Sequence, residues 1–131
     1  MSAPFRFHSS LQVDFLDDLY AGDWSYAESV FGNVLEEIPK LMNLAEKELE
    51  KGSAEGLRQA LHKTKPLFGY VGLPETQSMI QIMENNCKQG TMNGTMHHDF
   101  ENLKNKINSD SVILKDELRR LTEYNNNEHE N

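Results

Sequence analysis

Apolar residues recur at helical spacing along most of this chain, and that periodicity restricts its fold more than any other feature of the sequence. The longest apolar stripe keeps its phase over about eight helical turns. Its members are Met96, Phe100, Leu103, Ile107, Leu114, Leu118 and Leu121. The polar run at positions 108–110 lies inside this stripe without shifting its phase, so we expect one long helix here. The pattern predicts an all-α protein.

Earlier segments predict four further helices, separated by glycine and proline signals. We expect a short amphipathic helix over about 10–20, followed by longer helices over about 24–51, 54–71 and 74–90. The short helix should carry its apolar residues on one side, namely Leu11, Phe15, Leu16 and Leu19.

Individual residues mark the helix ends. Ser53 is a typical N-cap, and Pro74 suits an early helical position. Pro39 should bend its helix rather than end it, because the apolar pattern resumes in phase after it. A loop is expected over 91–95, before the last helix.

Four long helices with short connections predict an antiparallel up-down-up-down four-helix bundle, with the additional short N-terminal helix packed across one end or side. The 131 residues contain neither an internal repeat nor an interdomain linker, so we expect a single domain over 1–131. Its folded part should span about 10–124. We expect flexible N-terminal residues and a polar, fraying tail over 125–131.

Charge and cysteine content restrict the class of partner and compartment. The formal net charge of −8 argues against nucleic-acid binding, which needs a basic surface. The single cysteine, Cys87, cannot form an internal disulfide, and the sequence has neither a secretory signal nor an apolar run of membrane-spanning length. We therefore expect a cytoplasmic protein with no membrane insertion. We also expect a monomer.

His62 is one residue out of phase with the inward stripe of the third long segment. That stripe consists of Leu57, Leu61, Thr64, Phe68 and Val71. A helix turns by about 100 degrees per residue, so His62 should point away from the core. It should share its outward face with Arg58, Lys65, Pro66 and Gly69.

This face has the residue types that phosphoryl chemistry requires. A neutral imidazole is a nucleophile near physiological pH, and the Lys65 ammonium is placed to steady an arriving phosphoryl group. Lys63 is a supporting candidate. Gly69 removes a side chain and would let another protein approach the histidine closely.

Antiparallel pairing of two helices should bring Glu84 opposite His62. If the turn centres near Leu73, each residue lies about eleven positions from it. Glu84 could then accept the Nδ1 proton of His62 and leave Nε2 free to attack. Gln81, one turn away, could hold a water molecule or a phosphoryl oxygen.

The segment from Ala60 to Leu73 resembles the signature of histidine-containing phosphotransfer (HPt) domains, in which a lysine follows the histidine by three positions and a glycine by ten. His62, Lys65 and Gly72 match. The likeness extends over nearly the whole chain in helix order and loop placement.

The resemblance implies that His62 takes a phosphoryl group from the aspartate of a response-regulator receiver domain and returns it to a receiver in a multistep phosphorelay of two-component signal transduction. Receivers, and also hybrid histidine kinases, are the implied partners. The metal and most catalytic groups would come from the receiver, so we expect a phosphocarrier without autonomous catalysis, cofactor or metal site. A Glu or Gln on the following helix contacts the histidine in the family, which supports Glu84.

Pro66 departs from the family pattern, which usually has glycine directly after the lysine. A proline inside a helix removes the hydrogen bond to the carbonyl four residues back, which here belongs to His62. We expect a local bend at the histidine and a docking surface, including Arg58, Pro66 and Gly69, that differs from the usual one.

Several alternatives stay open. His62 could be an ordinary surface histidine, Lys63 and Lys65 a solvated charged face, and Glu84 a solvated carboxylate. The chain could also bind and regulate a receiver or kinase without carrying phosphate, or be a purely structural bundle. His97 and His98 point in different directions on a helix and favour a surface role over a metal site. Candidates for an apolar partner-facing patch, at least half of them expected in the core, are Leu16, Tyr20, Trp24 and Phe68.

Overall fold

The computed structural model describes residues 4–89, 92 and 94–130, and every regular element in them is a helix. The helices are α1 (Val13–Tyr20), α2 (Trp24–Glu50), α3 (Ala54–Tyr70), α4 (Pro74–Cys87) and α5 (Met96–Glu130). The all-α class, the four long helices and the short N-terminal helix are confirmed. None of the described helices is long and apolar enough to cross a membrane.

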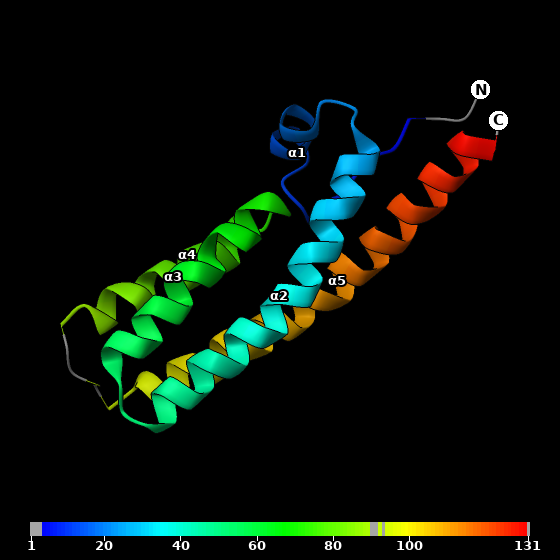
Figure 1. Ribbon diagram of the computed structural model, residues 1–131. Coiled ribbons are helices and arrows are strands. Elements are labelled where there is room, and N and C mark those ends of the chain that lie inside the picture. Colours follow the sequence, from blue (N-terminus) through cyan, green and yellow to red (C-terminus); the bar gives the residue numbers. More distant parts are fainter. Residues whose placement is uncertain (1–3, 90–91, 93, 131) are drawn as a thin grey trace.

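The four long helices form an antiparallel bundle in chain order. Helix α2 packs against α3 and α5, and α4 packs against α3 and α5. Figure 1 shows α3 and α4 as a hairpin beside one half of the long α2–α5 pair, with α1 near the start of α2. The other half of that pair extends past the hairpin, so a different part of the chain must cover it.

Local signals explain where the helices begin. The Ser53 hydroxyl accepts a hydrogen bond from the Gly56 amide at 3.0 Å and caps α3. Asp23 caps α2 in the same way through the Tyr26 amide. Pro74 occupies the first turn of α4, where its missing N–H costs nothing. The predicted roles of Ser53 and Pro74 are confirmed.

The N-terminal segment covers the half of the α2–α5 pair that lacks the hairpin. Phe5 and Phe7 are buried, and the Phe7 ring stacks on Phe31 with centroids 5.7 Å apart. Phe5 packs edge-on against Tyr124 of α5. The expectation that the folded part starts near residue 10 was therefore wrong for these two residues. Two phenylalanines with no helical periodicity give no sign in the sequence that they belong to the core.

Helix α5 extends further than expected at its C-terminal end. It runs through Glu130, past the predicted limit at 124. Asn125 is buried and donates from Nδ2 to the Trp24 carbonyl at 3.0 Å and to Glu28 Oε1 at 2.7 Å. These bonds hold Asn125 against α2. From its polarity alone, the residue was expected to belong to a fraying tail.

The other helix limits differ by a few residues from the predicted ones. Helix α1 begins at Val13, and it buries Leu16 but exposes Phe15 and Leu19. Helix α4 ends at Cys87, before the predicted limit at Gly90, which lies outside the described residues. The predicted loop over 91–95 is described only at positions 92, 94 and 95.

Two predictions concerned interruptions within helices. Helix α5 continues through positions 108–110, as expected, and buries Asp110, which accepts hydrogen bonds from Thr76 and Lys106. Helix α2 continues through Pro39, and α3 continues through Pro66. The bends expected at the two prolines stay predictions.

Gly72 joins the hairpin to the N-terminal segment. Its φ of +74° lies in the left-handed region, and a Cβ there would lie 2.8 Å from Leu16 Cδ1 and 3.0 Å from the Gln12 amide nitrogen. The Gln12 amide donates to the Gly72 carbonyl at 2.8 Å. Only glycine allows both the turn conformation and this close approach.

Candidate functional site

Helix α3 displays His62 to solvent because its other face is buried. Every member of the inward stripe, from Leu57 to Val71, is buried. The one polar member, Thr64, satisfies its hydroxyl by donating to the Ala60 carbonyl at 2.7 Å. The His62 side chain is 64% exposed. The outward orientation predicted from helical phase is confirmed.

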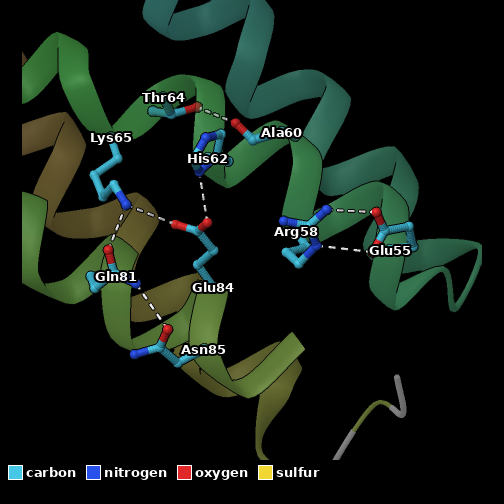
Figure 2. Close-up of polar contacts among 9 residues, drawn as sticks. All are labelled: Glu55, Arg58, Ala60, His62, Thr64, Lys65, Gln81, Glu84 and Asn85. Carbon is cyan, nitrogen blue, oxygen red and sulfur yellow. Dashed lines mark hydrogen bonds and ion pairs between the residues drawn. The ribbon is translucent and has the colours of Figure 1, made fainter. Parts of the chain in front are cut away.

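Glu84 lies opposite His62 on α4, at the predicted place. Its Oε1 is 2.8 Å from His62 Nδ1, while its side chain is only 2% exposed. The alternative of a solvated surface carboxylate for Glu84 is therefore wrong. Figure 2 shows the carboxylate between the imidazole and the Lys65 ammonium.

The protonation of Glu84 follows from these contacts. Burial alone would raise the pKa of its carboxyl group, but hydrogen bonds from His62 and Lys65 offset this and leave the pKa below its ordinary value. Glu84 is therefore ionised at neutral pH and accepts a hydrogen bond. A neutral His62 then carries its proton on Nδ1 and has its lone pair on Nε2.

Lys65 turns toward α4 rather than into open solvent. Its Nζ donates to Glu84 Oε2 at 3.2 Å and to Gln81 Oε1 at 2.5 Å. The Gln81 amide nitrogen in turn donates to Asn85 Oδ1 at 2.9 Å. The structure brings together His62, Lys65, Gln81 and Glu84 (Figure 2), all four of which were predicted from sequence. It adds Asn85, which the sequence did not single out.

Gly69 lies against α4 instead of opening the face to a partner. A Cβ at this position would lie 2.8 Å from Nε2 of Gln77. That amide nitrogen donates to the Lys65 carbonyl at 3.3 Å. The space next to Gly69 is thus occupied from within the protein, which corrects the reason given for this glycine from sequence. Gln77 was not predicted, because its contact depends on the packing of α3 on α4.

The remaining predicted residues lie around this cluster without joining it. Arg58, one turn before His62, donates from Nε and Nη2 to the Glu55 carboxylate at 2.9 and 2.7 Å. Hydrogen bonds from Arg58 and Gln59 lower the pKa of Glu55 to about 2. Lys63 and Pro66 are exposed.

An apolar pocket of about 300 Å³ opens where α1, α2 and the end of α3 meet. Its exposed rim includes Leu19, Tyr26 and Tyr70, and Leu67 of α3 also lines it. The sequence suggested a different patch, of which Leu16, Tyr20 and Phe68 prove to be buried. Tyr20 instead donates its hydroxyl hydrogen to the Tyr70 carbonyl at 2.6 Å and ties α1 to α3.

Two sequence features lie apart from the site chemistry. Cys87 is buried, and burial raises the pKa of its thiol, which agrees with the packing role expected for it. His97 and His98 are exposed at the start of α5. Within the described residues, no group of three or more His, Cys, Asp or Glu side chains is placed to hold a metal ion.

Comparison with known proteins places this geometry in a family. The family model of the Hpt domain matches residues 29–124, which include the whole cluster around His62. The chain belongs to the Hpt domain family. Membership implies histidine phosphotransfer within a phosphorelay, and Hpt domains are phosphocarriers.

Curated relatives agree with this assignment over part of the chain. The signal transduction histidine-protein kinases BarA of Shigella flexneri and of Escherichia coli (strain K12) are each 30% identical over 71 residues. The match covers 54% of this chain but only 8% of either kinase. No solved structure matches the chain. The Hpt domain thus resembles one small region of these much longer proteins.

Proposed function

We propose that His62 is the reversible phosphoryl acceptor, taking the group from a receiver aspartate and passing it to the same or another receiver. The observation that carries the proposal is an exposed imidazole whose Nδ1 lies 2.8 Å from a buried carboxylate. This pair directs the Nε2 lone pair outward, where an incoming phosphoryl group would arrive.

In the proposed transfer, Nε2 of His62 attacks the phosphorus atom of the receiver's aspartyl phosphate. The new N–P bond forms as the P–O bond to the aspartate breaks, and the electron pair leaves with the receiver carboxylate. The ring gains positive charge and keeps its Nδ1 proton, which Glu84 holds. A buried, ionised carboxylate stabilises that charge more strongly than water would. The reverse step returns the group.

Lys65 and Gln81 have supporting roles in this proposal. The Lys65 ammonium offsets the Glu84 charge. Because it is three residues from His62 on the same helix, we expect it to contact an equatorial phosphoryl oxygen. Gln81 Oε1 accepts a hydrogen bond from this ammonium, and we expect Gln81 to hold a water molecule or a phosphoryl oxygen during transfer.

The proposed docking surface includes a positive and an apolar part. Arg58, Lys63 and Lys65 give α3 three of the 13 basic residues of a chain whose net charge is −8. Arg58 also pairs with Glu55 and Lys65 with Glu84, so the positive charge of this surface is partly offset. The three basic residues would attract an acidic receiver site. Next to them, the pocket with Leu19, Tyr26 and Tyr70 on its rim offers an apolar contact. Pro66 is part of this surface, since it is exposed one turn after His62.

A transfer assay tests the proposal. The protein is incubated with a purified receiver domain phosphorylated beforehand with radiolabelled phosphate, and the label on each chain is followed. We expect an acid-labile label that is lost in His62→Gln and kept in His97→Gln, a matched exposed histidine on α5. Label that persists in His62→Gln would contradict the proposal.

Pro66, which stands directly after Lys65 where the family usually has glycine, favours a second candidate function. In that case the chain would bind and regulate a receiver or a histidine kinase without carrying phosphate. Stable binding of the receiver, together with no label on the wild-type protein, would favour this function. The expected cytoplasmic location and monomeric state also stay predictions.

A further inference from the structure

Lys65 lies where the backbone hydrogen bonding of α3 is interrupted. It precedes Pro66, and a proline disfavours the helical conformation in the residue before it. Pro66 also lacks the N–H that would bond the His62 carbonyl, so α3 has one fewer backbone bond here. The helix nevertheless continues to Tyr70. A contact from outside the α3 backbone would therefore add to what holds Lys65 in the helical conformation.

Gln77 of α4 makes such a contact. Its Nε2 donates to the Lys65 carbonyl, the carbonyl of the Lys65–Pro66 peptide bond, at 3.3 Å. To reach it, the Gln77 side chain passes over Gly69, where a Cβ would lie 2.8 Å from the same nitrogen. The absence of a side chain at Gly69 makes the contact possible.

The polar residues of α4 that meet Lys65 follow helical spacing. Gln77, Gln81 and Glu84 are four and three residues apart, so they lie on one face. Gln77 binds the Lys65 carbonyl, and Gln81 and Glu84 bind its ammonium. Helix α4 therefore holds Lys65 at both its backbone and its side-chain end.

We propose that Gln77, with the space left by Gly69, is a positioning residue that holds Lys65 in the helical conformation from which its ammonium reaches Glu84. The role of Lys65 in phosphoryl transfer rests on the proposed function, whereas its position in the resting protein does not. Pro66 removes the bond to the His62 carbonyl, whereas Gln77 adds a bond at the neighbouring Lys65 carbonyl.

The first test observes the resting protein. Gln77→Met keeps the length of the side chain but cannot donate to the carbonyl. In this variant we expect the Lys65 ammonium protons to exchange with solvent several times faster in ¹⁵N NMR spectra, because Gln81 and Glu84 hold them less well. Gln89→Met, an exposed glutamine beyond α4, is the control. Unchanged exchange in Gln77→Met would overturn the proposal, whether or not the wild-type protein carries phosphate.

The second test measures reaction with phosphoramidate, a small phosphoryl donor that needs no partner protein. Nε2 of His62 displaces ammonia from phosphorus, and ³¹P NMR follows the product. We expect Gln77→Met to lower the rate about fivefold, the effect of losing one typical hydrogen bond. The loss should vanish in a Lys65→Met background and shrink in a Pro66→Ala background.

Two outcomes separate the possible failures. If Gln77→Met lowers the phosphorylation rate equally in the wild-type and Lys65→Met backgrounds, Gln77 acts only through general stability. That result would overturn the positioning role. A wild-type protein that takes no phosphoryl group would contradict the proposed function, while the NMR test would still decide the position of Lys65. If Gln77→Met fails to fold, Gln77→Glu replaces it, because an ionised carboxylate cannot donate either.

Discussion

Glu84 is the residue on which the chemistry of the site depends, because it contacts both His62 and Lys65 from a buried position. Removing its carboxylate frees the imidazole to take either tautomer and leaves a ring charge uncompensated. We expect Glu84→Ala to slow phosphorylation of His62 by roughly 10- to 100-fold, the range for a charge-assisted hydrogen bond.

Single-turnover transfer from a phosphorylated receiver measures this effect. Glu75→Ala, an exposed glutamate on the same helix, is the matched control and should transfer at the wild-type rate. Equal rates in Glu84→Ala and Glu75→Ala would show that the 2.8 Å contact plays no part in the reaction.

The lowered pKa of Glu84 also predicts how folding stability depends on pH. A carboxyl group whose pKa is lower in the folded state contributes stability above its unfolded value, here 4.5, and loses it as pH falls through the folded pKa. The wild-type protein should therefore lose stability more steeply than Glu84→Gln as pH falls from about 6 to about 3. Urea unfolding across this range measures the difference; parallel curves would mean that the pKa is not lowered.

At the scale of the elements, the α3–α4 turn depends on the conformation of Gly72. An alanine there meets both an unfavourable φ and the Gln12 backbone, which cannot move aside as a flexible side chain does. Gly22 has a similar φ of +82° but nothing within 4 Å of its missing Cβ. We expect Gly22→Ala to lower the free energy of unfolding by about 1 kcal/mol. The loss in Gly72→Ala should exceed the loss in Gly22→Ala by about 2 kcal/mol or more.

Urea unfolding of the two glycine variants provides the comparison, in which Gly22→Ala is the control for the cost of φ alone. Similar losses in both would imply that the close contact of Gly72 with Leu16 and Gln12 does not form in solution.

Elements with strong periodicity could be predicted from the sequence, together with the site residues that depend on it. The phase of α3 fixes the outward position of His62, and a simple antiparallel register places Glu84 opposite. Contacts between elements were harder to predict from the sequence. The Gln77 side chain that explains Gly69 is eight residues along and on the next helix, and no local sequence pattern identifies it. The burial of Phe5 and Phe7 likewise depends on α2 and α5 extending past the hairpin.

At the scale of the whole molecule, the N-terminal segment completes the bundle where the α3–α4 hairpin ends (Figure 1). The His8 amide donates to buried Glu117 of α5 at 2.9 Å, and the Arg120 guanidinium lies 4.8 Å from the Phe5 ring centroid and donates to the Arg6 carbonyl. This segment therefore acts as part of the core rather than as a tail.

Truncating Phe7 tests that role. Phe7 is 5% exposed, so we expect Phe7→Ala to lower the free energy of unfolding by about 3 to 5 kcal/mol. Phe15 on α1 is 45% exposed, so Phe15→Ala should lower the free energy of unfolding by about 1 kcal/mol or less. Denaturant unfolding followed by circular dichroism compares them. A loss at Phe7 no larger than that at Phe15 would mean that the segment is not packed in solution.

The central claim is that Glu84 holds Nδ1 of His62 so that Nε2 carries the phosphoryl group. The most direct measurement is NMR of ¹⁵N-histidine-labelled protein after transfer from a phosphorylated receiver, in which ³¹P–¹⁵N coupling identifies the bonded nitrogen. We expect the phosphorus to be coupled to Nε2 of His62 alone. Coupling to Nδ1, or to another histidine, would contradict the account.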